Sequence, residues 1–217
     1  MSLYETLGNP GKGNGGQLYG VAIGIVTNNK DPDEMGRVKL RFPWRDSNDE
    51  SYWARIATLM AGSEMGTFFL PEVGDEVLVA FDQGDIEHPF VIGSLWNGKE
   101  KPPEKNTDGK NNVRKIKSRS GHEIILNDEQ SKEQVVVKTK AGHAITLNDS
   151  AGGEKIEIKD KAGSNFIVID SVKNNIDMQC SMQLKIKANM IEIEADSMIT
   201  IKAGATLTLQ GALVKIN

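Results

Sequence analysis

Residues 176–217, IDMQCSMQLKIKANMIEIEADSMITIKAGATLTLQGALVKIN, decide the fold of this chain. They repeat a unit in which two apolar side chains flank one polar residue, at steps of 7 or 8 residues. Alternation with period two is typical of a β-strand that has one buried and one solvated face. A small residue four positions after the start of each unit fits a tight corner; these residues are Cys180, Ala188, Ala195, Ala203 and Gly211. The stretch therefore predicts short strands joined by corners, as in a β-helix.

A single chain is poorly suited to form this β-helix, because two inward side chains per strand give too small a hydrophobic core. Three intertwined chains solve the problem, since each strand pairs with strands of its neighbours and the inward side chains meet on the axis. The alternative is an ordinary antiparallel sheet with even hairpins. We predict the trimer, with a core that consists of Leu184, Ile186, Ile191, Ile193, Ile199, Ile201, Leu207 and Leu209.

A longer repeat precedes this stretch. Gly121, Gly142 and Gly163 follow one another at intervals of 21 residues, each ahead of an alternating strand. The sequence predicts a turn and a returning strand after each of these strands; the turns are at residues 129–132, 150–153 and 171–174. Three two-strand units are therefore expected between the N-terminal domain and the narrow C-terminal repeat.

Residues 18–96 have the pattern of a compact β domain. GRVKLRFPW (residues 36–44) alternates apolar and basic residues, and in EVLVAFDQ (residues 76–83) we expect Val77, Val79 and Phe81 to form one buried face. Gly84 and Asp85 are a hairpin signal, which we expect to begin a turn over GDIEHP. Five or six strands within about 80 residues indicate a small Greek-key barrel such as an OB-fold.

These residues also carry a family resemblance. GRVKLRFPW, YWARIAT and LPEVGDEVLVAFDQGDIEHPFVIGSLWN resemble the OB-fold domain of spike proteins in contractile injection machines. This family includes the baseplate spike of contractile-tailed phages and the VgrG spike of type VI secretion. The resemblance implies a structural homotrimer, with a baseplate hub protein at the OB-fold end and transient membrane contact during puncture.

The C-terminal end of the chain predicts a further partner. The last strand unit ends at Ile216, which would leave an open apolar end, and open strand ends are usually capped. The resemblance implies that a PAAR-repeat tip protein forms this cap. We expect the contact at Leu213, Val214, Lys215, Ile216 and Asn217.

Together these patterns predict an all-β chain with an N-terminal OB-fold barrel and a C-terminal intertwined trimeric β-helix needle. Its expected parts are a flexible arm (1–17), the OB-fold (18–100), a linker or collar (101–115) and the β-helical spike (116–217). Some phage relatives have a lysozyme domain at the linker, but these 15 residues are too few to hold one. We therefore predict no enzyme.

Composition limits the other partners. The formal net charge of −4 lacks the basic signature of a nucleic-acid-binding protein. The N-terminus has no apolar core typical of a signal peptide, and no run of 18 apolar residues occurs. We expect synthesis in the cytoplasm and incorporation into a phage-tail-like particle or virion baseplate, from which contraction delivers the spike.

No catalytic, cofactor or metal site is predicted. His122 and His143 follow two of the repeat glycines, where a trimer would form two rings of three histidines. The simpler interpretation is that both are ordinary polar residues at strand starts. Two other functions stay open: a cell-wall or polysaccharide-degrading enzyme on a β-helix scaffold, and an OB-fold nucleic-acid-binding protein that stacks bases on Trp44, Tyr52, Trp53 or Trp96.

Overall fold

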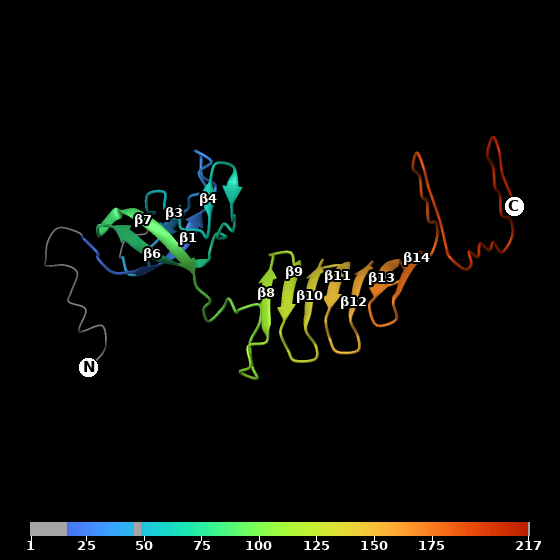
Figure 1. Cartoon of the computed structure of the whole chain (residues 1–217). Coiled ribbons are helices and arrows are strands. Elements are labelled where there is room, and N and C mark those ends of the chain that lie inside the picture. Colours follow the sequence, from blue (N-terminus) through green and yellow to red (C-terminus); the bar gives the residue numbers. More distant parts are fainter. Residues whose placement is uncertain (1–16, 46–48, 217) are drawn as a thin grey trace. The chain divides into compact units, whose positions relative to one another are not determined.

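The computed structural model describes residues 17–45 and 49–216, and every regular element within them is a β-strand. The prediction of an all-β chain is confirmed for these residues. The chain divides into two compact units at Thr107 and Asp108, and the strands of each are labelled in Figure 1. The predicted N-terminal arm lies outside the described residues, apart from Gln17.

The first unit is built on one five-stranded sheet in the order β2-β1-β6-β7-β3. Its strands are β1 (Ala22–Asn28), β2 (Lys39–Arg41), β3 (Arg55–Ile56), β6 (Glu76–Asp82) and β7 (Asp85–Ser94). Val38 and Ala54, each the residue immediately before one of the two edge strands, exchange backbone hydrogen bonds of 3.0 and 2.7 Å. This bridge joins β2 to β3 and closes the sheet into a small barrel.

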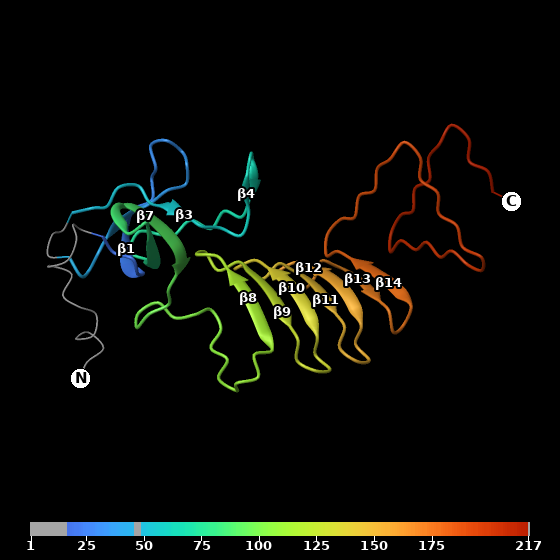
Figure 2. The same ribbon diagram turned by 60° about the vertical axis from the view of Figure 1, so that its left-hand side comes forward.

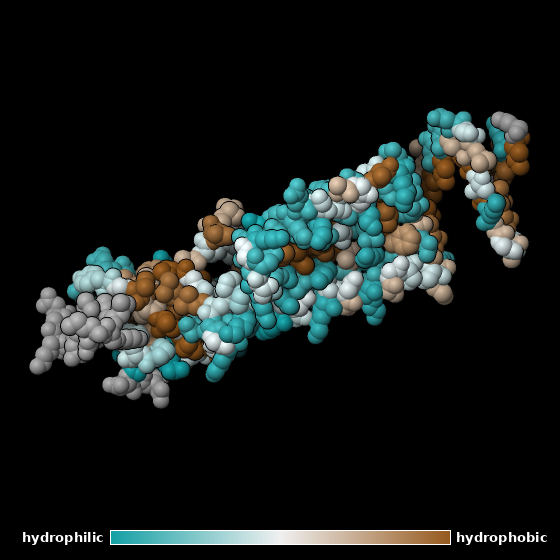
Figure 3. All heavy atoms as spheres, turned by 90° about the horizontal axis from the view of Figure 1, so that it is seen from below, coloured by the Kyte–Doolittle hydropathy of each residue, from teal (hydrophilic) through white to brown (hydrophobic). Residues whose placement is uncertain are grey.

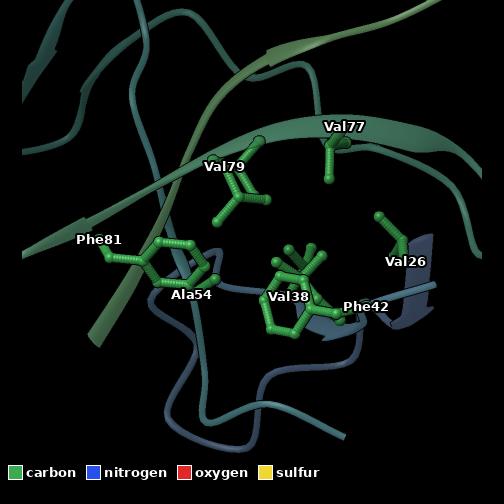
Figure 4. Packing of buried hydrophobic residues seen from close by; sticks show 9 residues of the cluster. Val26, Val38, Phe42, Ala54, Val77, Val79 and Phe81 are labelled. Carbon is green, nitrogen blue, oxygen red and sulfur yellow. The ribbon is translucent and has the colours of Figure 1, made fainter. Parts of the chain in front are cut away.

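The barrel interior includes the apolar residues of the two alternating patterns, together with Val26, Ala54 and Val91. Val77, Val79 and Phe81 on β6 face Val26, Val38 and Phe42 (Figure 4). Val38, Leu40 and Phe42 are at most 1% exposed. The rings of Phe42 and Phe81 lie 5.6 Å apart, a distance typical of favourable aromatic pairs.

The turn between β6 and β7 lies one residue earlier than predicted. Gln83 and Gly84 both have positive φ, 49° and 82°, as a two-residue type I′ hairpin requires. A Cβ at position 84 would also lie 3.3 Å from the backbone nitrogen of Leu18. The interpretation of GDIEHP as a turn was wrong, because β7 begins at Asp85 and includes Ile86 to His88.

A carboxylate organises the loop after β1. Asp31 accepts hydrogen bonds from the side chain of Arg37 at 2.8 and 2.7 Å, and from the backbone of Asp33, Met35 and Arg37. The side chain of Asp31 is 3% exposed. The hydrogen bonds from Arg37, more than the other contacts, hold the pKa of Asp31 far below its ordinary value of 3.8.

This clamp predicts a pH-dependent stability. A carboxyl group whose pKa is lowered by folding stabilises the folded state above its ordinary pKa, and loses that contribution as pH falls through the folded value. Wild type should therefore exceed Asp31→Asn in melting temperature by a constant margin above about pH 5, and the margin should shrink below pH 3.8. Asp33→Asn is the control, because Asp33 also pairs with Arg37 but is 66% exposed. An equal loss in both variants would contradict the assignment.

The second unit is a seven-stranded antiparallel meander in which each strand pairs with the next along the chain. Figure 2 shows these strands side by side in chain order. They are β8 (Val113–Lys117), β9 (Glu123–Asn127), β10 (Gln134–Lys138), β11 (Ala144–Asn148), β12 (Lys155–Lys159), β13 (Phe166–Asp170) and β14 (Asn175–Gln179). β8 starts at Val113, within the predicted linker.

The turns of this meander follow the 21-residue repeat. The backbone N–H of Ser118 donates to the carbonyl of His122, and that of Thr139 donates to His143 in the equivalent turn. Gly121, Gly142 and Gly163 all have positive φ, which explains their regular spacing. The third turn is one residue longer, because the N–H of Asp160 donates to Asn165. The predicted turns at 129–132 and 150–153 are confirmed by hydrogen bonds between their end residues.

Residues 180–216 contain no strand in the single chain. The backbone is extended and bends at residues 181–182, 189, 196–197, 204–205 and 212. Each bend begins one residue after one of the small residues at which a corner was predicted. The corners therefore agree with the sequence repeat, whereas the pairing of the extended stretches within a trimer stays a prediction.

Candidate assembly surface

One face of the β8–β14 sheet is apolar along its whole length. Register places Val137 between Ile124 and Ile145, and Val135 between Leu126 and Leu147. The same two rows continue through every other strand pair, with Arg114 as the one polar member. The apolar members are Ile116, Ile124, Leu126, Val135, Val137, Ile145, Leu147, Ile156, Ile158, Ile167, Ile169, Ile176 and Met178.

These two rows are open to solvent in the single chain. All members except Ile167 are between 39% and 69% exposed. Seven strands at about 4.8 Å give rows roughly 29 Å long. A continuous apolar surface of this kind marks a protein–protein interface, since monomers rarely expose one.

The opposite face of the sheet is rich in ion pairs. Glu123 is 9% exposed and receives Lys117 at 3.2 Å and Lys138 at 3.0 Å. Hydrogen bonds from Lys138 and then Lys117 lower the pKa of Glu123. Glu157 contacts Lys159 at 2.9 Å and Lys155 at 3.8 Å. These charged side chains form ion pairs with one another within the chain. The apolar face, by contrast, has no other part of the sheet packed against it.

The predicted trimer core lies on the extended C-terminal stretch. Its eight side chains are 51–71% exposed, and the single chain does not bring them together. In the face shown in Figure 3, apolar side chains of this stretch are open to solvent. If these side chains were buried, the backbone beside them would be buried as well, and buried backbone groups need hydrogen-bond partners. We therefore expect those partners to come from other chains.

The predicted tip contact is also uncovered. Leu213, Val214 and Ile216 are between 50% and 88% exposed, and Lys215 is exposed. Asn217 lies outside the described residues. The structure therefore leaves the assignment of a partner to these residues as a prediction.

Sequence reasoning missed most of the candidate surface. The predicted core began at Leu184, whereas the apolar rows of the sheet begin at Ile116. The alternation of these strands had been recognised, but the predicted core was restricted to the C-terminal repeat, although Ile124/Leu126, Val135/Val137 and Ile145/Leu147 also share one parity.

A second apolar surface was missed on the first unit. This surface lies on the hairpin of β4 (Ala61–Gly62) and β5 (Met65–Gly66) and its flanks, for which the sequence analysis gave no prediction. It presents large apolar side chains to solvent; these are Leu59, Met60, Met65, Phe68 and Phe69.

The aromatic residues considered for base stacking are engaged in other contacts or lie apart. Arg37 and Lys39 lie over the ring of Trp53 at 5.8 and 5.5 Å. Trp44 packs beside Phe42 with ring centres 5.6 Å apart. Trp53 also lines a hollow of about 670 Å³ with Arg55, His88 and Phe90, and Arg55 lies 4.9 Å over the Phe90 ring.

The histidines of the repeat are exposed side chains at the ends of turns. Nδ1 of His122 accepts a weak hydrogen bond from the N–H of Lys140 at 3.4 Å. Within residues 17–45 and 49–216, no three His, Cys, Asp or Glu side chains are placed to hold a metal ion. In the same residues, no helix is long and apolar enough to cross a membrane.

Comparison with known proteins identifies the first unit. Residues 22–96 match the family model of the type VI secretion system/phage-baseplate injector OB domain. Over these residues the chain is similar to injector-type OB domains. The match covers the closed barrel described above, so the predicted OB-fold and its resemblance to injector spike proteins are confirmed.

Curated relatives of this OB domain are spike proteins. The spike protein VgrG3 of Vibrio cholerae is 34% identical over 113 residues, which are 48% of this chain and 11% of the relative. VgrG2a of Pseudomonas aeruginosa is 37% identical over 75 residues, 33% of this chain and 9% of the relative. The actin cross-linking toxin VgrG1 of Vibrio cholerae is 35% identical over 111 residues, 48% of this chain and 10% of the relative. The chain thus spans about a tenth of the length of these relatives.

Proposed function

We propose that this protein is the structural spike of a contractile injection machine. In this proposal three copies form a needle at the centre of a baseplate, which contraction drives through a target envelope. The observation that carries it is the open apolar face of β8–β14, which continues as the exposed alternating repeat of residues 184–216. The injector-type OB domain supports the same function from an independent part of the chain.

A trimer would use each surface described above. Three sheets with their apolar rows toward one axis form a closed prism, and the ion-paired faces are then turned to solvent. The extended stretches of residues 180–216 would pair between chains, so that backbone hydrogen bonds link all three chains at each level. Such cross-linking resists unfolding under load, and the useful property of a needle is a slow unfolding rate.

We propose one protein partner for the OB domain and another for the C-terminal residues of the spike. We assign the OB domain to the hub of the baseplate, and the exposed residues Leu213 to Asn217 to a PAAR-repeat tip protein. Contact with the target membrane would be transient, and the spike itself would be a component of a phage tail, a tailocin, an extracellular injection particle or a type VI-like machine.

Resistance to detergent tests the proposed needle. An unboiled sample in SDS gel electrophoresis should migrate as a trimer, because intertwined strands unfold slowly. The boiled sample should migrate as a single chain of 23.7 kDa. Single-chain migration of both samples would contradict an intertwined needle.

Removal of the C-terminal end tests the tip assignment. Deletion of Gly211–Asn217 should leave the trimer folded, because the rest of the core is retained, and should abolish capture of a PAAR-repeat protein in a pull-down. The control is Lys202→Ala, which changes an exposed residue of the same extended stretch outside the assigned contact and should leave capture unchanged. Unchanged capture by the truncated spike would place the tip protein elsewhere.

A further inference from the structure

The two long sides of the β8–β14 sheet carry opposite charge. Turns lie along both sides, because each strand returns directly beside the previous one. We call the turns at 118–122, 139–143 and 160–165 the basic row. We call the turns at 128–133, 149–154 and 171–174 the acidic row.

The basic row presents one cation per turn at 21-residue steps, namely Arg119, Lys140 and Lys161, all exposed. The turns stack closely, since a Cβ on Gly121 would lie 3.7 Å from the side chain of Lys140, and one on Gly142 would lie 3.5 Å from Lys161. Successive cations are therefore about 9.6 Å apart, two strand spacings. Asp160 is the single carboxylate of the row, and hydrogen bonds within its own turn occupy it.

The acidic row contains five carboxylates and two lysines. The carboxylates are Asp128, Glu129, Glu133, Asp149 and Glu154. Of the lysines, Lys132 is paired with Glu129 at 2.7 Å and Lys173 with Asp170 at 3.2 Å. The carboxylates lie on the first two turns of this row, two strands apart like successive cations of the basic row, and Asp128 is also ion-paired with Arg114 of its own chain.

We propose that the basic row of each chain lies against the acidic row of the next chain in a closed ring of three. This inference rests on the proposed trimer and adds which surfaces meet. A three-fold ring uses head-to-tail contacts, in which two different patches of each subunit touch. With the apolar rows toward the axis, the two long sides of a sheet are the parts nearest its neighbours. The shared spacing also sets how neighbouring chains align along the three-fold axis. If one chain were shifted along the axis by one two-strand repeat, a cation and a carboxylate at the ends of the rows would be left unmatched.

Reversal of the basic row tests this contact. The variant R119E/K140E/K161E places carboxylates against carboxylates at every interface, and such like-charge contacts oppose association. Light scattering of the full chain in 0.15 M NaCl should show loss of the trimer, with partial recovery in 1 M NaCl, where exposed charges are screened. The matched control K30E/K99E/K105E has the same change in net charge on exposed residues of the other unit and should stay trimeric.

A combined variant distinguishes pairing from general destabilisation. Addition of E133K/D149K/E154K to the reversed basic row restores opposite charges across the interface without touching the Arg114–Asp128 and Lys132–Glu129 ion pairs, and should restore the trimer in 0.15 M NaCl. No recovery would contradict the pairing of the two rows. A basic-row variant with the mass and salt dependence of wild type would overturn this inference alone, whereas a monomeric wild type would overturn the spike proposal as well.

Discussion

Replacement of Ile193 by Asp is expected to abolish the trimer and to give monomeric or insoluble protein. Ile193 belongs to the predicted axial core and is 71% exposed in the single chain, so its burial depends on the other chains. In a trimer, three carboxylates would meet on the axis. Each is costly to bury without a partner, and each repels the other two. Light scattering of the purified variant measures the outcome.

Glu192→Ala is the matched control for this prediction. Glu192 precedes Ile193 on the extended stretch and has the opposite parity, so its side chain should face solvent in the trimer. The control should assemble like wild type. Equal tolerance of both substitutions would show that the assignment of inward and outward faces is inverted.

Replacement of Phe42 by Ala is expected to have the largest effect on the OB domain. Phe42 is 1% exposed and packs against both Phe81 and Trp44. Loss of a buried aromatic side chain and the cavity that remains typically cost about 3–5 kcal/mol. Chemical denaturation should therefore show a much lower unfolding free energy for the OB transition, while the strand signal of the second unit is retained.

The same substitution at an exposed ring provides the control. Phe69 is 72% exposed on the β5 flank, so Phe69→Ala removes an equal number of atoms without opening a core cavity. Its unfolding free energy should stay within about 0.5 kcal/mol of wild type. A loss in Phe69→Ala as large as that in Phe42→Ala would mean that the barrel interior described above does not determine stability.

The alternation of apolar residues made much of the fold predictable. Val77, Val79 and Phe81 are buried as expected, because period two places alternate side chains on one face wherever a strand forms. Gly121 and Gly142 marked their turns because the positive φ needed there favours glycine. The start of β7 was missed because Gly84 signals a turn but does not fix which of its neighbours is central.

Other features depend on contacts that no local pattern encodes. The hydrogen bonds between Asp31 and Arg37 join residues six positions apart in an irregular loop, where no periodic pattern indicates the contact. The bridge between Val38 and Ala54 closes the barrel through residues outside any named strand. For residues 180–216 the sequence predicts the corners, but the partners of the extended stretches lie outside the single chain.

The molar mass of the folded full chain tests the central claim most directly. Light scattering during size-exclusion chromatography should give three times the chain mass of 23.7 kDa, with circular dichroism of the same fraction confirming its strand content. The mass should not change on dilution across the micromolar range, because intertwined chains separate only by unfolding. A strand-rich protein that eluted with the mass of one chain would contradict the spike proposed here.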